Sequence, residues 1–88
     1  GGWLDIADWR LVMLDSVVPG KAGGRLSAHE LEELERTLTG AGRRHALVCL
    51  HHHPVAMSSR WLDEVGLENA DAFFEVIARQ RNVRGLVW

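Results

Sequence analysis

The sequence contains a single cysteine and no apolar stretch long enough to span a membrane. One cysteine, Cys49, cannot build a disulfide framework, and its place inside an apolar run fits a reducing compartment. A bilayer-spanning helix needs roughly 20 consecutive apolar residues. We therefore expect no membrane partner and a cytoplasmic location.

An excess of charge of one sign is also absent. The chain has 12 acidic and 10 basic residues, with a formal net charge of −2. Proteins that bind nucleic acid without regard to sequence normally carry a basic stripe. We therefore expect no nucleic-acid partner. The composition, 47% hydrophobic and 25% charged, is that of an ordinary globular domain.

The chain has 88 residues, about the size of one small domain, and it lacks an initiator methionine. It opens with two glycines and stops at Trp88, inside an apolar run. No internal repeat or linker divides it. We expect residues 1–88 to be a single segment, the middle part of a larger domain.

Apolar runs alternate with amphipathic stretches along the chain. Residues 9–15, 46–50 and 83–88 are short apolar runs typical of buried strands. Ser27 and Glu30 form a capping-box pattern before leucines at helical spacing, and Gly40 ends that helix. Asn69 precedes a second helix whose apolar face includes Phe73. The order strand–helix–strand–helix–strand predicts an α/β fold with a parallel sheet.

The most informative stretch is residues 46–54, an apolar strand that runs into His51, His52, His53 and Pro54. Proline cannot donate to a sheet ladder, so the histidines stand at the end of the strand. Neutral imidazole binds transition metals near pH 7. Successive side chains on a strand point to opposite faces, so the three rings cannot easily surround one ion.

Two interpretations of the histidines remain open from spacing alone. The run supplies one or two metal ligands, or its imidazoles cap backbone carbonyls at a polar strand end. The other histidines, His29 and His45, are not placed to complete a site. Asp15 and Ser16 follow the first strand, where they either cap a turn or line a crevice.

Several segments together resemble the calcineurin-like metallophosphoesterase superfamily, and most closely its bacterial 3′,5′-cyclic-AMP phosphodiesterases. The segments are residues 9–16, 24–36, 44–54 and 61–69. The resemblance implies a β-sandwich flanked by helices, with two divalent metal ions at the carboxyl ends of the strands. The ions would be Fe, Mn, Zn or Co.

The resemblance also assigns roles to the three histidines. His52, two positions before the proline, matches the family's metal ligand. His53 would lie close to that ligand or to the substrate, and His51 would belong to the strand end. The family's other metal-binding motifs are absent from these 88 residues and would be expected before Gly1 and after Trp88.

This pattern predicts phosphodiester hydrolysis by the parent protein, with a 3′,5′-cyclic nucleotide such as cyclic AMP as substrate. No catalytic residue is expected within the segment itself, so the isolated 88 residues should be inactive. The alternative is a small non-catalytic α/β module that binds a partner or a single metal ion. Exposed strand edges would also let the chain associate with itself.

Overall fold

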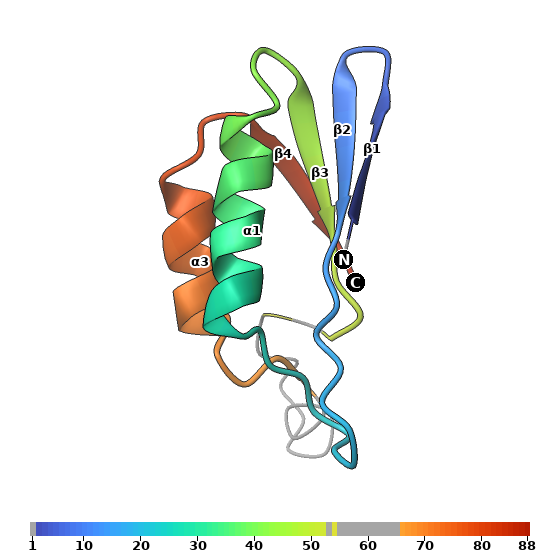
Figure 1. Ribbon diagram of the computed structural model, residues 1–88, viewed down its shortest axis with the longest axis vertical. Helices are drawn as coiled ribbons and strands as arrows, with labels where there is room; N and C mark the ends of the chain where they lie inside the picture. The colour runs from blue at the N-terminus through green and yellow to red at the C-terminus, as the bar shows by residue number, and fades with distance from the viewer. Residues whose placement is uncertain (1, 53, 55–65) are drawn as a thin grey trace.

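The computed structural model describes residues 2–52, 54 and 66–88. Its elements are β1 (Gly2–Ile6), β2 (Trp9–Met13), α1 (Ala28–Thr39), β3 (His45–Cys49), α3 (Ala70–Ala78) and β4 (Val83–Val87). The strands form a mixed sheet in the order β1-β2-β3-β4. Both helices lie on the same side of the sheet, as Figure 1 shows. The predicted α/β fold is confirmed.

Strands β2, β3 and β4 are parallel, as the sequence predicted, with Val12 opposite Val48 and Val48 opposite Leu86. Strand β1 was not predicted. It pairs antiparallel with β2, from Gly2 opposite Met13 to Ile6 opposite Trp9. The hairpin turn uses Ala7, a non-glycine residue at φ 51°. Glycine and asparagine are the usual signals at such positions, and neither occurs at this turn, so local sequence patterns do not predict it.

The helices begin and end close to the predicted residues. Ser27 caps α1, where its hydroxyl accepts a 3.1 Å hydrogen bond from the Glu30 N–H. Asn69 precedes α3 but does not cap it with its side chain. Its amide instead pairs with the backbone of Leu26, accepting from the N–H at 2.9 Å and donating to the carbonyl at 2.7 Å. This pairing ties the start of α3 to the loop before α1.

The core lies between the sheet and the two helices. Alternate residues of the strands, such as Ala46 and Val48, point to the helices and are fully buried. They pack against Leu34 and Leu38 of α1 and against Phe73 and Val76 of α3. Val76 had not been assigned to the apolar face of its helix. Neither helix among the described residues is long and apolar enough to cross a membrane.

A buried arginine anchors the hairpin to α1. Arg10 donates to both carboxylate oxygens of Asp5, at 2.8 and 3.0 Å, and to the carbonyl of Thr37 at 2.9 Å. Its guanidinium also lies 3.8 Å from the centre of the Trp3 ring. These hydrogen bonds lower the pKa of Asp5 from its ordinary value of 3.8 and raise the pKa of Arg10. The guanidinium is buried while Asp5 stays partly exposed, and these hydrogen bonds offset the cost of removing the charge from water.

Candidate functional site

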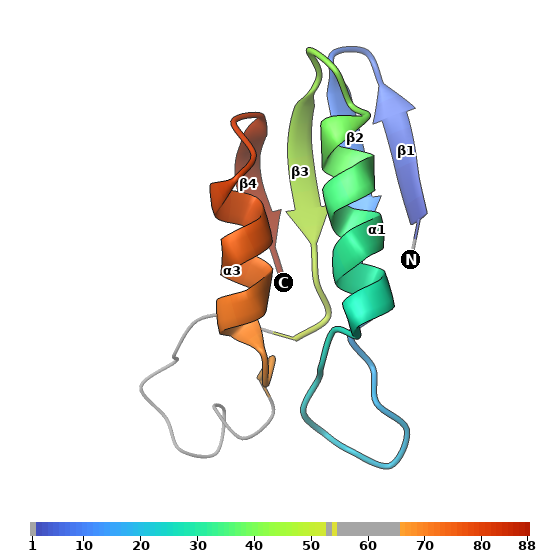
Figure 2. The ribbon, with the colours of Figure 1, turned by 60° about the vertical axis from the view of Figure 1, so that its left-hand side comes forward.

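The carboxyl ends of the parallel strands lie at the same end of the sheet, and the segments that follow β2 and β3 begin there. Residues 14–27 leave β2 and residues after Cys49 leave β3 from this same end (Figure 2). The Leu14 N–H donates to the Cys49 carbonyl at 3.0 Å, and the Leu50 N–H donates to the Val87 carbonyl at 2.7 Å. Side chains that follow neighbouring strands are therefore brought together here.

His51 and His52 differ in burial, and both lie in a bend just beyond the end of β3. His51 is exposed, whereas His52 is buried, with 7% of its surface accessible. Their rings stand edge to face, with centroids 4.8 Å apart. His53 lies outside the described residues, so its predicted place near the ligand or substrate stays a prediction. Of the described pair, His52 is the one that the fold encloses.

Both ring nitrogens of His52 have hydrogen-bond partners from the loop after β2. Nδ1 lies 2.7 Å from the hydroxyl oxygen of Ser16, and Nε2 lies 3.0 Å from the carbonyl oxygen of Ala22. A carbonyl can only accept, so the hydrogen of the neutral ring is on Nε2. The Ser16 hydroxyl therefore donates to Nδ1. The fold fixes the tautomer of this imidazole through residues 30 and 36 positions away.

Gly24 completes the surroundings of the ring. A Cβ atom on Gly24 would collide with Nδ1 and Cγ of His52 and would lie 2.6 Å from the Ser16 carbonyl. The absence of a side chain is what lets the loop close against the imidazole. We refer to Ser16, Ala22, Gly24 and His52 as the His52 cluster.

Backbone hydrogen bonds hold the loop of the His52 cluster in place. The Arg25 N–H donates to the Ser16 carbonyl at 2.9 Å, which closes the loop on itself. Gly24 donates to the Gly66 carbonyl at 2.9 Å and accepts from the Glu68 N–H at 2.7 Å. The loop after β2 is thereby joined to the chain that leads into α3. The ring of His52 is held by ordered backbone and not only by side chains.

Asp15 and Ser16 follow β2, and the sequence left open whether they cap a turn or line a crevice. The structure shows a different role for each. Asp15 caps a turn, because its carboxylate accepts a 3.1 Å hydrogen bond from the Val17 N–H. Ser16 lines the cluster and is completely buried. A serine beside a histidine also resembles a nucleophile and its base. Complete burial keeps substrate from the Ser16 hydroxyl, so this pair does not act as one in the described structure.

The sequence did not single out Ala22 or Gly24. Gly20, Gly23 and Gly24 lie close together in the sequence, which indicates a loop but no packing role for Gly24. His29 and His45 lie apart from the cluster. His45 stands at the opposite end of β3, with its ring 5.3 Å from that of Trp9, and His29 lies in the first turn of α1.

Metal-binding histidines commonly have the ring nitrogen that does not bind the ion hydrogen-bonded, which fixes the ring. In His52 both ring nitrogens are hydrogen-bonded, to Ser16 and to the Ala22 carbonyl. Among residues 2–52, 54 and 66–88, no group of three His, Cys, Asp or Glu side chains could hold an ion. Any ion at His52 therefore needs ligands from beyond the described part of the chain.

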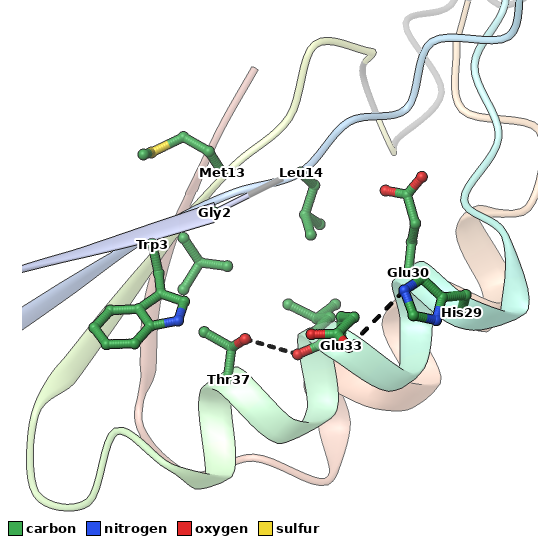
Figure 3. A pocket seen from close by; sticks show the side chains of 10 residues that line it. Gly2, Trp3, Met13, Leu14, His29, Glu30, Glu33 and Thr37 are labelled. Atoms are coloured by element: carbon green, nitrogen blue, oxygen red, sulfur yellow. Dashed lines mark hydrogen bonds and ion pairs between the residues drawn. The ribbon is translucent and has the colours of Figure 1, made fainter.

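A pocket of about 470 Å³ lies elsewhere, between the β1–β2 hairpin and α1. Trp3 and Leu14 face it from the side of the sheet, and His29 and Glu33 face it from the helix (Figure 3). The Met13 side chain points away from the helix, to the other face of the sheet. The Nε2 atom of His29 is 3.9 Å from a Glu33 carboxylate oxygen, at the exposed rim. Because none of the His52 cluster lines this pocket, its volume does not mark the candidate site.

No protein-family model matches the chain. Individual proteins do. The chain is 42% identical over 85 residues to the 3′,5′-cyclic adenosine monophosphate phosphodiesterase CpdA of Pseudomonas aeruginosa, covering 97% of this chain and 31% of that protein. It is 43% identical over 79 residues to CpdA of Escherichia coli K12, covering 90% and 29% respectively. A probable cyclic nucleotide phosphodiesterase of Vesicomyosocius okutanii is 31% identical over 83 residues, covering 94% and 36%.

The chain thus spans about a third of the length of the curated relatives it matches. Within that third the similarity is nearly continuous. It confirms the resemblance to the bacterial cyclic-AMP phosphodiesterases of the calcineurin-like metallophosphoesterase superfamily.

Proposed function

We propose that the intact protein hydrolyses a phosphodiester with the help of metal ions, and that its substrate is a 3′,5′-cyclic nucleotide such as cyclic AMP. The observation that carries this proposal is the 42% identity, across 97% of the chain, to a protein named as a cyclic-AMP phosphodiesterase. The position of the His52 cluster at the carboxyl edge of a parallel sheet supports it. This edge is where α/β folds place their ligands.

His52 is the residue of this segment that we assign to metal binding. Two divalent ions, Fe, Mn, Zn or Co, would when bound activate water and neutralise the phosphoryl oxygens. The chain's own contribution is to hold one imidazole rigidly at the edge of the sheet. His51, exposed at the same edge, and His53 would lie near the ligand or the substrate. The catalytic acid and base would come from outside this segment.

We also propose that the 88 residues form part of a larger domain of the β-sandwich type. The sheet face opposite the helices supports this, because it is apolar and open to solvent. Leu4, Ile6, Trp9, Met13 and Val87 each expose between 39% and 54% of their surface. An apolar face of this extent is normally covered by another layer of structure. A cytoplasmic location is consistent with the free thiol of Cys49.

The test is His52→Ala in the intact protein, assayed for cyclic-AMP hydrolysis with Mn²⁺ or Zn²⁺ supplied. Loss of the residues around a metal ligand costs about 10–100-fold in affinity or activity, so loss of the ligand should cost at least 100-fold. His29→Ala, an exposed histidine of α1, is the matched control and should retain wild-type turnover. Chelation should abolish the activity, and added metal should restore it.

The 88 residues alone should not turn over bis(4-nitrophenyl) phosphate with any of these metals. Wild-type activity in His52→Ala would remove His52 from the metal site. An intact protein without metal-dependent turnover would instead favour the non-catalytic module. In that case the measurable property of the 88 residues would be binding of one metal ion or of a partner.

A further inference from the structure

The two nitrogens of the His52 ring lie in different surroundings. Nδ1 is enclosed, because its hydrogen bond with Ser16 is buried and the backbone of Gly24 is pressed against the ring. Nε2 points to the Ala22 carbonyl through a hydrogen bond that is only partly buried. Ala22 itself is exposed, in the loop after β2. Nδ1 is thus enclosed by the fold, whereas Nε2 faces the backbone carbonyl of an exposed residue.

A metal ion needs space beside the nitrogen that binds it, at about 2.0–2.1 Å for zinc. Beside Nδ1 that space is taken by the Ser16 hydroxyl and by Gly24. Beside Nε2, the described part of the chain places a backbone carbonyl of an exposed residue. Metal binding through Nε2 requires the Ala22 carbonyl to move away, whereas binding through Nδ1 would require the buried loop to come apart.

We propose that Ser16 is a positioning residue. Its hydrogen bond to Nδ1 orients the His52 ring so that Nε2 can bind the ion, and the ion then takes the position that the Ala22 carbonyl occupies beside Nε2. The proposal rests on the metal-binding role of His52 in the proposed function. It adds the nitrogen that binds, the residue that orients the ring and the group that is displaced.

The hydrogens balance in this exchange. In the described structure Nε2 carries the ring hydrogen and Ser16 donates to Nδ1. When Nε2 gives its lone pair to an ion, one proton leaves Nε2 and one is taken up at Nδ1, so the ring stays neutral. The Ser16 hydroxyl then turns and accepts from Nδ1. A hydroxyl can both donate and accept, so Ser16 serves the ring in either tautomer.

The experiment uses the intact protein with ¹⁵N-labelled histidine and Zn²⁺ as the probe. Long-range ¹H–¹⁵N spectra report which ring nitrogen carries the hydrogen. Without zinc, His52 should be protonated at Nε2. With zinc, it should be protonated at Nδ1 and bound through Nε2. Zinc bound at Nδ1, or a ring that does not respond to zinc, would overturn the inference, and this measurement needs no variant.

Ser16→Ala adds a second measurement, and Ser27→Ala is its matched control because Ser27 caps α1 away from the cluster. Ser16→Ala should weaken zinc binding about 10–100-fold, the range found when the partner of a metal-binding histidine is removed. Ser27→Ala should bind zinc within about twofold of wild type. A folded Ser16→Ala protein with wild-type zinc affinity would contradict the role of Ser16.

The outcome can be separated from that of the proposed function. Zinc bound through Nε2 in a protein that hydrolyses no cyclic nucleotide would support the inference about Ser16 and His52 and would contradict the proposed hydrolase activity. Metal-dependent hydrolysis with zinc bound at Nδ1 would support the proposed hydrolase activity and contradict the inference about Ser16 and His52.

Discussion

The imidazole of His52 lies directly against the α-carbon of Gly24, 28 positions earlier in the chain, so closely that no side chain fits between them. The conformation of Gly24 is one that any residue can adopt, since its φ is not among the positive values found for Gly20 and Gly42. The requirement for glycine is therefore one of space. It comes from the ring and from the Ser16 carbonyl, both of which are buried.

We expect Gly24→Ala to destabilise the fold by about 1–3 kcal/mol, the usual cost of inserting a methyl group into a well-packed site. The His52 ring should also lose its hydrogen bond with Ser16, because the ring must move. Urea unfolding measures the first effect and the histidine NMR signals measure the second. Gly2→Ala is the control, since a Cβ there has no neighbour within 4 Å. Equal stability of the two variants would contradict the packing.

The ion pair of Asp5 and Arg10 should make stability depend on pH. The hydrogen bonds from Arg10 lower the pKa of Asp5 in the folded state below 3.8. The folded state therefore binds the proton less readily than the unfolded chain. The stabilising contribution is complete above the unfolded value and is lost as the pH falls through the folded one.

The pH dependence of this stabilisation can be tested by urea unfolding. The free energies of unfolding of wild type and Asp5→Asn are measured from neutral to acid pH. The variant should be less stable near pH 6, and the difference should shrink as the pH falls below 3.8. In an Arg10→Met background, Asp5→Asn should produce a smaller pH-dependent difference, because Arg44, 3.5 Å from the Asp5 carboxylate, still lowers its pKa. A difference that stays constant with pH in the wild-type background would refute the linkage.

Ala7 in the β1–β2 turn is a place where the protein can be made more stable. Its φ of 51° lies in the left-handed region, which costs a residue with a Cβ about 1–2 kcal/mol. Glycine avoids that cost but loses about 0.5–1 kcal/mol of backbone entropy. We expect Ala7→Gly to stabilise the chain by up to about 1 kcal/mol.

Thermal and urea unfolding of Ala7→Gly would measure the gain. Ala78→Gly, at the end of α3, is the matched control and should instead lower stability by about 0.5–1 kcal/mol. A loss of stability in both variants would show that the turn does not hold Ala7 in this conformation.

The 88-residue chain should associate with itself in solution. Strands β1 and β4 are the outer strands of the sheet as described, and such edges pair with other chains. Light scattering should show a mass that rises with protein concentration. Leu4→Lys places a charge at an exposed position of the outer strand β1 and should reduce association. Thr39→Lys places the same charge at an exposed position of α1 and should not. A monomer at all concentrations would count against this prediction.

The sequence by itself determined the parts of this protein that depend on neighbouring residues. Apolar runs and helical spacing predicted three parallel strands and two helices, and the capping pattern at Ser27 located the start of α1. The motif around His52 also indicated the relatives that the chain resembles. These signals are local, because strand and helix periods are written in consecutive residues.

Only the tertiary structure decided what depends on residues far apart in the chain. The structure contains β1, whose turn at Ala7 and Asp8 carries no glycine. It also shows that the Asn69 side chain hydrogen-bonds to Leu26 and does not cap α3. It also brought Ser16, Ala22 and Gly24 around His52. Hydrogen bonds and close contacts over about 30 positions leave no local pattern, since either partner alone is an ordinary loop residue.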